Sequence, residues 1–412
     1  MNKNYSSETE RASKTKWWSY LGPGIITAAI VFGPSKITIT SKMGASYGYS
    51  LIWLVVVAIG LMVVFTEMAA RIAYARQDSL LQVIKSKWGN IMPLIVGSGI
   101  FLVTSSFQAG NTIGVGISLG EMTGTSPALW MVLFTAVAIS MLFMRSLYKV
   151  LEKCMILLVL LMLVSFLITF IMSKPSLSAM AAGLIPRIPN GSETLVIAFT
   201  ASCFSLVAAF YQTYLVQERL KNRPVTHEGY RSIESRAGIL LLGVLVIVVM
   251  GCAAAVLHEK KLAVQTGMDM AKALEPLFGE FATWLFLLGL FGASFSSLLG
   301  NAVVGGTLMG DALYGSSNLN NKKNRVLIAT IMAIGLIMAL IFGKLPLEAI
   351  ILAQSVTIFI VPIIGIALFN IANDKKIMGY LVNSRLQNVI GILGILLLTV
   401  LAVINAIELF TR

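Results

Sequence analysis

The sequence Gly33-Pro34-Ser35-Lys36 interrupts an apolar segment that runs from about residue 21 to residue 45. Pro34 has no N–H group and its ring clashes with the preceding turn, while Gly33 has little preference for a helix, so the pair predicts a helix break. At membrane depth a break is tolerated only where protein or a water-filled cavity satisfies the freed backbone groups. Lys36 adds an ammonium near the bilayer centre, at a cost of about 2.5–3.5 kcal/mol. A broken helix with a charge at its break is typical of a substrate site in a membrane transporter.

The alternative is a proline-kinked helix whose lysine extends along its own stem to the membrane surface. Long apolar stretches flank Lys36 on both sides, so this route to the surface would be strained. We therefore favour the substrate site.

The composition sets the class of protein. The chain has 412 residues, of which 57% are hydrophobic and 12% are charged, whereas soluble domains carry about 25% charged residues. Apolar runs of about 20 residues recur along the chain, which predicts an all-α polytopic membrane protein and excludes a soluble enzyme. No nucleotide-binding loop is present, and we expect neither enzymatic activity nor a cofactor.

The basic residues predict the topology. Of the 31 lysines and arginines, 22 lie in the N-terminal tail and the even-numbered connections, and 8 in the remaining connections and the C-terminus. This bias places the N-terminus in the cytoplasm and the C-terminus outside. The net charge of +13 is therefore a topology signal and not a nucleic-acid surface. We expect a monomer in the plasma membrane, which in a bacterium is the inner membrane, with the lipid bilayer as its surroundings.

We predict eleven spans that form two inverted repeats of five, followed by one more. The predicted parts are a cytoplasmic tail (1–20), a first repeat (21–173), a second repeat (193–371) and an additional span (386–409). The spans cover about 21–45, 50–75, 91–118, 127–147, 150–173, 193–218, 234–257, 277–312, 324–343, 346–371 and 386–409. The sixth span has a small, polar centre around Ser202 and Ser205 but neither glycine nor proline there, so a break and a close-packed helix both fit.

The first span and its exit loop carry Gly22-Pro23-Gly24, Gly33-Pro34-Ser35-Lys36 and Tyr47-Gly48-Tyr49. These motifs resemble those of the NRAMP family of divalent-metal transporters. The stretch from Asp374 to Asn383 resembles the family's D-x-x-x-M-G-x-x-x-N, and Ala353-Gln354 resembles its A-Q pair in the tenth span. The resemblance implies a LeuT-type fold with broken helices 1 and 6, and alternating access around the breaks.

The family's metal-binding side chains are replaced in this sequence. Gly33 stands at the position of the family's Asp, and Lys36 at that of its Asn. In the sixth span, Ser205 and Val207 stand where the family has Met and His. The resemblance thus implies that only Gln354 is retained among side chains that could touch a metal, and that NRAMP-style proton coupling is lost. Sodium coupling through backbone carbonyls stays open.

The change in charge predicts an anion as the substrate. A divalent ion about 5 Å from Lys36 would be repelled by roughly 6–7 kcal/mol at an effective dielectric of about 20. An anion would instead meet the ammonium, serine hydroxyls and the free N–H groups at the start of a half-helix. We expect a small inorganic or carboxylate anion, with bicarbonate as the best guess, and no metal ligand. The expected anion-binding residues are Phe32, Gly33, Ser35, Lys36, Ile37, Thr38, Ser202, Cys203, Phe204, Ser205 and Gln354.

Two other functions fit the sequence. One is divalent-cation transport through a displaced site that uses Gln354, Asn301 or Gln108. The other is a binding protein or sensor that does not transport. Gln108 and Asn111 make the third span polar, which fits either a hydrated path or hydrogen bonding between helices.

Overall fold

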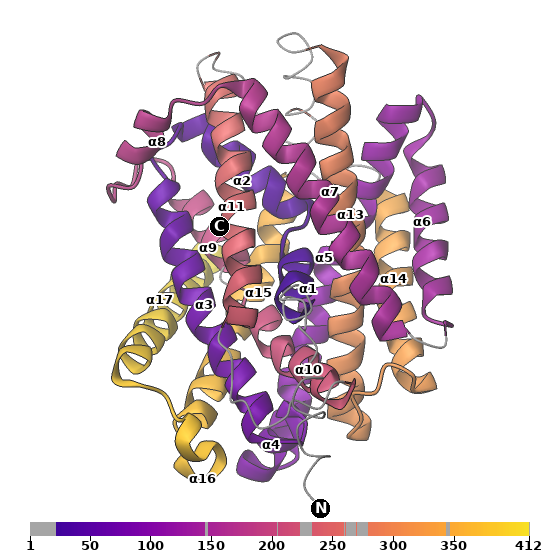
Figure 1. The fold of residues 1–412 in the computed structure, drawn as a ribbon, viewed down its shortest axis with the longest axis vertical. Helices are drawn as coiled ribbons and strands as arrows, with labels where there is room; N and C mark the ends of the chain where they lie inside the picture. The colour runs from indigo at the N-terminus through magenta and orange to yellow at the C-terminus, as the bar shows by residue number, and fades with distance from the viewer. Residues whose placement is uncertain are drawn as a thin grey trace, which may run out of the picture.

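The computed structural model describes residues 22–144, 147–203, 205–222, 233–258, 260, 269, 279–342 and 347–411. These ranges fold into helices without a strand (Figure 1). The helices are α1 (Gly22–Val31), α2 (Pro34–Tyr47), α3 (Ile52–Ala75), α4 (Leu80–Trp88), α5 (Ile91–Thr123), α6 (Pro127–Met141), α7 (Leu147–Ser173), α8 (Leu177–Ala182), α9 (Glu193–Cys203), α10 (Leu206–Asn222), α11 (Ile233–Ala253), the π-helical turn η2 (Ala254–His258), α13 (Glu280–Tyr314), α14 (Lys322–Phe342), α15 (Leu347–Ala372), α16 (Lys375–Met378), the 3-10 turn η3 (Gly379–Leu381) and α17 (Arg385–Thr411).

The helices confirm a polytopic membrane protein. Within the described ranges, eight helices are long and apolar enough to cross a membrane, or up to ten if each bent pair counts as one span. Every predicted span coincides with a helix or a pair of helices, but α6 has only 15 residues. The count of eleven spans and the division into repeats therefore stay predictions.

The predicted break in the first span is confirmed. The axes of α1 and α2 differ by 67°. Gly33 between them has an extended backbone, and its carbonyl accepts hydrogen bonds from the N–H groups of Lys36 at 3.0 Å and Ile37 at 3.2 Å. Pro34 is the first residue of α2, where its missing N–H costs nothing because that position has no partner within the helix.

The sixth span is divided into two helices as well, although these are not bent at the interruption by more than 40° as α1 and α2 are. α9 ends at Cys203 and α10 begins at Leu206, so Ser205 lies between two helices. The Ala209 N–H donates to the Ser205 carbonyl at 3.0 Å, and the Ala208 N–H lies 3.5 Å from its hydroxyl oxygen. A serine at a helix start supplies the acceptor that the first free N–H groups need, so the chain can break here without glycine or proline.

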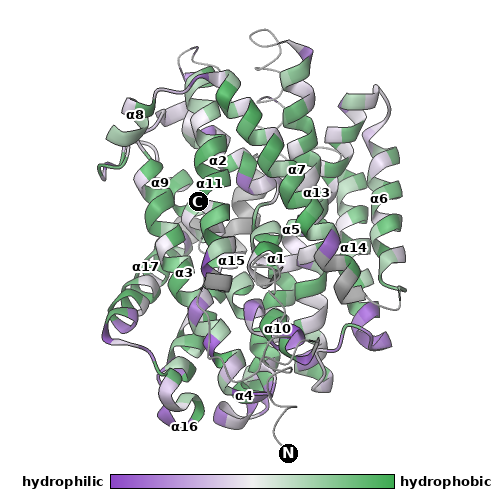
Figure 2. Ribbon diagram, viewed as in Figure 1, coloured by the Kyte–Doolittle hydropathy of each residue, from purple (hydrophilic) through white to green (hydrophobic). Residues whose placement is uncertain are grey.

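Helix α13 forms the centre of the fold and packs against α5, α7 and α14 (Figure 1). In the most apolar stretch of α13, 72% of the residues are buried, against 28% in α14 and in α17. Figure 2 shows hydrophobic residues along the outer helices, α6, α14 and α17 included. Since buried apolar side chains make the interior and exposed ones would otherwise face water, these outer helices face lipid.

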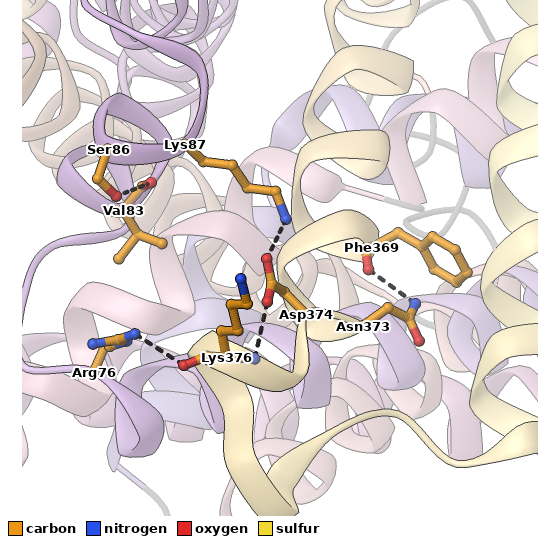
Figure 3. A network of polar contacts seen from close by, with 8 residues as sticks. All are labelled: Arg76, Val83, Ser86, Lys87, Phe369, Asn373, Asp374 and Lys376. Carbon is orange, nitrogen blue, oxygen red and sulfur yellow. Dashed lines mark hydrogen bonds and ion pairs between the residues drawn. The ribbon is translucent and has the colours of Figure 1, made fainter.

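Polar contacts tie α4 and the residue that ends α3 to the connection between α15 and α17. The Lys87 ammonium contacts Asp374 Oδ2 at 2.6 Å, and Arg76 Nη2 donates to the Lys376 carbonyl at 3.2 Å (Figure 3). Asp374 also accepts a hydrogen bond from the Lys376 N–H at 3.0 Å and so caps α16. The motif that resembles the family's D-x-x-x-M-G thus closes a short helix against α4.

The other end of α2 is fixed against η2. His258 Nδ1 lies 2.9 Å from the carbonyl oxygen of Ala45. Gly48 follows with a φ of +58°, and a Cβ there would lie 3.1 Å from the His258 ring. Both the left-handed backbone and the close ring require glycine at this position.

Candidate functional site

A cavity of about 50 Å³ lies where the two helix breaks meet. A site needs roughly 10–15 Å³ to hold one water molecule, so this cavity has room for a few waters or a small ion. Its wall is formed by residues from α1, α2, α5, α9, α10, α13 and α15, together with Gly33 and Ser205 between the helices. The polar residues of the wall are Ser35, Lys36, Asn111, Ser202, Ser205, Ser297, Asn301 and Thr357.

Lys36 lines this cavity and is almost completely buried, with 2% of its surface exposed. Its ammonium nitrogen lies 5.9 Å from the centre of the Phe199 ring, which belongs to α9. An aromatic face at this distance attracts a cation. Gly33, Ser35, Ser202 and Ser205 from the predicted set line the same cavity.

Three predicted residues lie outside the cavity wall. Phe32 is fully buried, and its ring meets the Phe166 ring edge-on at 5.9 Å. The Thr38 hydroxyl donates to the Pro34 carbonyl at 3.0 Å. The Ile37 N–H donates to the Gly33 carbonyl. The prediction that this amide is free to bind an anion is therefore wrong.

The remaining predicted residues cannot be placed. The side chains of Cys203 and Gln354 and all of Phe204 lie outside the described residues.

Two helices end at the cavity with their carbonyl ends. α1 ends at Val31, and α9 ends beside Ser202, whose hydroxyl donates to the Phe199 carbonyl at 3.0 Å. The carbonyl end of a helix carries a partial negative charge, which favours a cation nearby. In transporters with broken helices, unwound carbonyls and such ends are used to coordinate cations.

Asn111, Ser297 and Thr357 line the cavity as well, although none of them belongs to the predicted site residues. Asn111 and Ser297 lie close to Gly33, because a Cβ built on that glycine would be 3.2 Å from Asn111 Oδ1 and 2.8 Å from Ser297 Oγ. The polar run in the third span was the only signal for Asn111. Ser297 lies in a stretch of small residues that also fits close helix packing, so the sequence does not distinguish its role.

The cavity differs from a preformed metal centre. Among the residues that the structure describes, no group of three or more His, Cys, Asp or Glu side chains could hold a metal ion. The oxygen atoms available at the cavity are neutral hydroxyls, amide oxygens and backbone carbonyls, and oxygen ligands of this kind suit Mg²⁺, Ca²⁺ and Mn²⁺.

The chain as a whole matches one family. The model of the Nramp family, described as natural resistance-associated macrophage protein-like, matches residues 24–408. The chain belongs to the Nramp family. The predicted resemblance is therefore confirmed over nearly the whole chain.

Curated relatives in the Nramp family are metal transporters by name. A protein of Deinococcus radiodurans named divalent metal cation transporter MntH is 26% identical over 90% of this chain and 86% of its own length. A protein of the same name from Pectobacterium carotovorum is 24% identical over 94% of each chain.

Solved structures confirm the LeuT-type fold of this Nramp protein. A manganese transporter of Eremococcus coleocola superposes with a TM-score of 0.75 at 18% identity, over 95% of this chain and 87% of that one. A transporter of the nucleobase-cation-symport-1 family superposes with a TM-score of 0.56 at 14% identity, over 93% and 91% of the two chains.

These relatives contradict the expected anion. The prediction of bicarbonate or another small anion as substrate and partner is wrong, because the relatives are named as divalent metal cation transporters. The anion prediction rested on the charge of Lys36 and on free amides at the start of the half-helix. In the structure the Ile37 amide is satisfied, and two helix carbonyl ends and several neutral oxygens face the same cavity.

Proposed function

We propose that this Nramp protein is a secondary transporter of a divalent metal cation, and that the ion binds in the cavity between the two helix breaks. The observation that carries the proposal is that cavity. It lies at the carbonyl ends of α1 and α9 and is walled by neutral oxygens, in a chain whose relatives are named divalent metal cation transporters.

The carbonyl end of α1 is held in place by α13. Ser297 Oγ lies 3.2 Å from the Ala29 carbonyl and 3.1 Å from the Ile30 carbonyl, and Ser296 Oγ lies 3.1 Å from the Ala29 carbonyl. These hydroxyls satisfy two of the carbonyls that a helix end leaves without partners inside the helix. The break is thereby kept as a fixed structure rather than an unwound segment that an ion must first order, which lowers the entropy cost of binding.

Lys36 sets a limit on affinity. A divalent ion about 6 Å from its ammonium would be repelled by roughly 5 kcal/mol at an effective dielectric of about 20. The Phe199 ring attracts the ammonium toward α9, whereas Asn111 and Ser297 belong to α5 and α13. We therefore place the ion on the side of Gly33, Asn111 and Ser297, and we expect weaker binding than a site with a carboxylate would give.

Orientation and location complete the proposal. The 22 basic residues in the tail and even-numbered connections, against 8 elsewhere, support a cytoplasmic N-terminus and an outside C-terminus. We infer the plasma membrane, the inner membrane in a bacterium, since the relatives that match at least 90% of this chain are bacterial transporters.

The test is ion flux in proteoliposomes that contain the purified protein. We expect saturable uptake of Mn²⁺ or Mg²⁺ that empty liposomes do not show. Chloride and bicarbonate should give no flux above that background. A monodisperse protein that carries no divalent cation under any gradient would overturn the proposal.

A further inference from the structure

We propose that Asn111 on α5 and Ser297 on α13 supply metal-binding oxygens beside Gly33, and that Gln108 holds Asn111 in the orientation required. This inference rests on the proposed function. Because Gly33 and Lys36 replace the family's metal-binding Asp and Asn in the first span, a metal ion needs ligands from other helices.

The space beside Gly33 is the first observation. A Cβ on Gly33 would lie 2.8 Å from Ser297 Oγ and 3.2 Å from both Ser297 Cβ and Asn111 Oδ1. Contacts below 3.0 Å do not occur for real Cβ atoms, so a side chain and these two groups cannot occupy the space together. Oxygens from α5 and α13 therefore stand where a side chain from the first span would project.

The orientation of Asn111 follows from a chain of amides. The Leu298 carbonyl can only accept a hydrogen bond, so the Gln108 atom 2.8 Å from it must be the amide nitrogen Nε2. The Gln108 Oε1 atom then points away from Leu298. Asn111 Nδ2 lies 3.5 Å from that Oε1 and acts as its donor. Asn111 Oδ1 is then left on the side of Gly33, where it lines the cavity.

Burial makes this arrangement rigid. Gln108 is fully buried, and Asn111 is 2% exposed. Gly335 of α14 approaches so closely that a Cβ there would lie 2.3 Å from Gln108 Cγ. Because a buried amide that loses its partner is costly, both side chains are held to one hydrogen-bonded state.

Ser297 has oxygen lone pairs to spare. Its hydroxyl is fully buried and has one hydrogen, which it donates toward the Ala29 and Ile30 carbonyls. A hydroxyl oxygen has two acceptor positions, so Ser297 Oγ can face a cation while it stabilises the end of α1. Asn111 is thus proposed as a ligand, Ser297 as a ligand, and Gln108 as a positioning residue.

The experiment measures Mn²⁺ binding to the purified protein in detergent by calorimetry, together with Mn²⁺ uptake in proteoliposomes. We expect Asn111→Leu to weaken binding at least tenfold. Asn111→Asp has nearly the same shape and adds a negative charge beside the ion, so it should bind Mn²⁺ at least tenfold more tightly. The matched control is Asn405→Leu, which changes a buried asparagine on α17 outside the cavity wall and should leave binding unchanged.

The role of Gln108 is tested by a double-mutant cycle. Changes to groups that orient a metal ligand cost about 10–100-fold in affinity, which is the loss expected for Gln108→Met. If Gln108 acts through Asn111, the same change in the Asn111→Leu background should have almost no further effect on binding. Full additivity of the two losses would contradict the positioning role.

The outcomes separate the two proposals. Wild-type protein that binds Mn²⁺, with both Asn111 variants within twofold of it, would overturn this inference and leave the transport function intact. Wild-type protein that neither binds nor transports Mn²⁺ would overturn the proposed function itself. If Asn111→Leu does not fold, the Asn111→Asp variant still tests the inference, because it is expected to bind Mn²⁺ more tightly than the wild type.

Discussion

The hydroxyl of Tyr214 donates a hydrogen bond to Asp311 Oδ2 at 2.7 Å and so joins α10 to α13. The same hydroxyl oxygen accepts a hydrogen bond from the Leu81 N–H of α4 at 3.2 Å. Gln82 of α4 completes the contact, with its Nε2 3.5 Å from Asp311 Oδ1. The buried phenol of Tyr214 therefore connects α10, the second helix of the sixth span, to two other helices.

Tyr214→Phe should lower the stability of the protein. The change leaves the buried Asp311 carboxylate and the Leu81 N–H without their shared partner, and a buried group left unsatisfied costs about 1–3 kcal/mol, more if it is charged. Thermal unfolding of the purified protein in detergent measures the effect. Tyr380→Phe is the control. Because Tyr380 is 89% exposed, this variant should have the same melting temperature as the wild type. Equal melting temperatures for all three proteins would contradict the prediction.

Gly33→Ala should impair transport. The added methyl group would lie 2.8 Å from Ser297 Oγ, so Ser297 or the break between α1 and α2 must shift. We expect Mn²⁺ uptake in proteoliposomes to fall at least tenfold. Gly60→Ala is the matched control on α3, where a Cβ would meet nothing within 4 Å. Alanine at position 60 should raise the free energy of unfolding by about 0.5–1 kcal/mol, because it favours the helix more than glycine does. Unchanged uptake by Gly33→Ala would show that the space beside Gly33 is not used.

Lys36→Gln should strengthen metal binding. Removing the ammonium removes a repulsion of roughly 5 kcal/mol for a divalent ion about 6 Å away, at an effective dielectric of about 20. Partial relaxation of the site will reduce the gain, and we expect a dissociation constant for Mn²⁺ at least tenfold lower. The measurement is calorimetric titration, with Lys42→Gln on the same helix but outside the cavity wall as the control. Weaker binding in Lys36→Gln would mean that the lysine supports the site.

The contact between Lys87 and Asp374 should give a pH-dependent stability. The hydrogen bond from Lys87 holds the pKa of the Asp374 carboxyl below its ordinary value (Figure 3). A carboxyl whose pKa is lower in the folded state stabilises the folded protein at pH values above its unfolded pKa of about 3.9. This stabilisation is lost as the pH falls through the pKa of the folded state.

Asp374→Asn should therefore unfold at a lower temperature than the wild type at pH 6, and the difference should disappear as the pH falls below about 4. Thermal unfolding between pH 3 and pH 7 measures both curves. Asp78→Asn, at an exposed residue, is the control. A difference that stays constant over this range would exclude the ion pair as its cause.

The fold could be predicted from the sequence because lipid imposes strong constraints. Inside a membrane, backbone polar groups can find hydrogen-bond partners only in helices or closed barrels. Apolar runs therefore predict helices without knowledge of their neighbours. Gly33-Pro34 predicted the first break for the same local reason. The second break depends on Ser205 as a cap and on packing around it, so the sequence allowed it but did not require it.

The site was harder to predict than the fold. Lys36 and its serine neighbours could be placed at the break from the chain itself, but Asn111 and Ser297 reach Gly33 only through the packing of α5 and α13 against it. The substrate was mispredicted because one charged side chain was weighed without its surroundings. Neutral oxygens and helix ends leave no distinct pattern in a sequence, and here they form most of the polar wall.

The contact between His258 and the Ala45 carbonyl has a mechanical consequence. It clamps the far end of α2 to the π-helical turn η2, while the near end of α2 forms the cavity through Ser35 and Lys36. A tilt of α2 about the break would drag that turn with it, in the manner of a lever hinged at Gly33. The imidazole contact and the cavity therefore lie at opposite ends of one helix, so a change that shifts η2 is expected to alter the position of Ser35 and Lys36 as well.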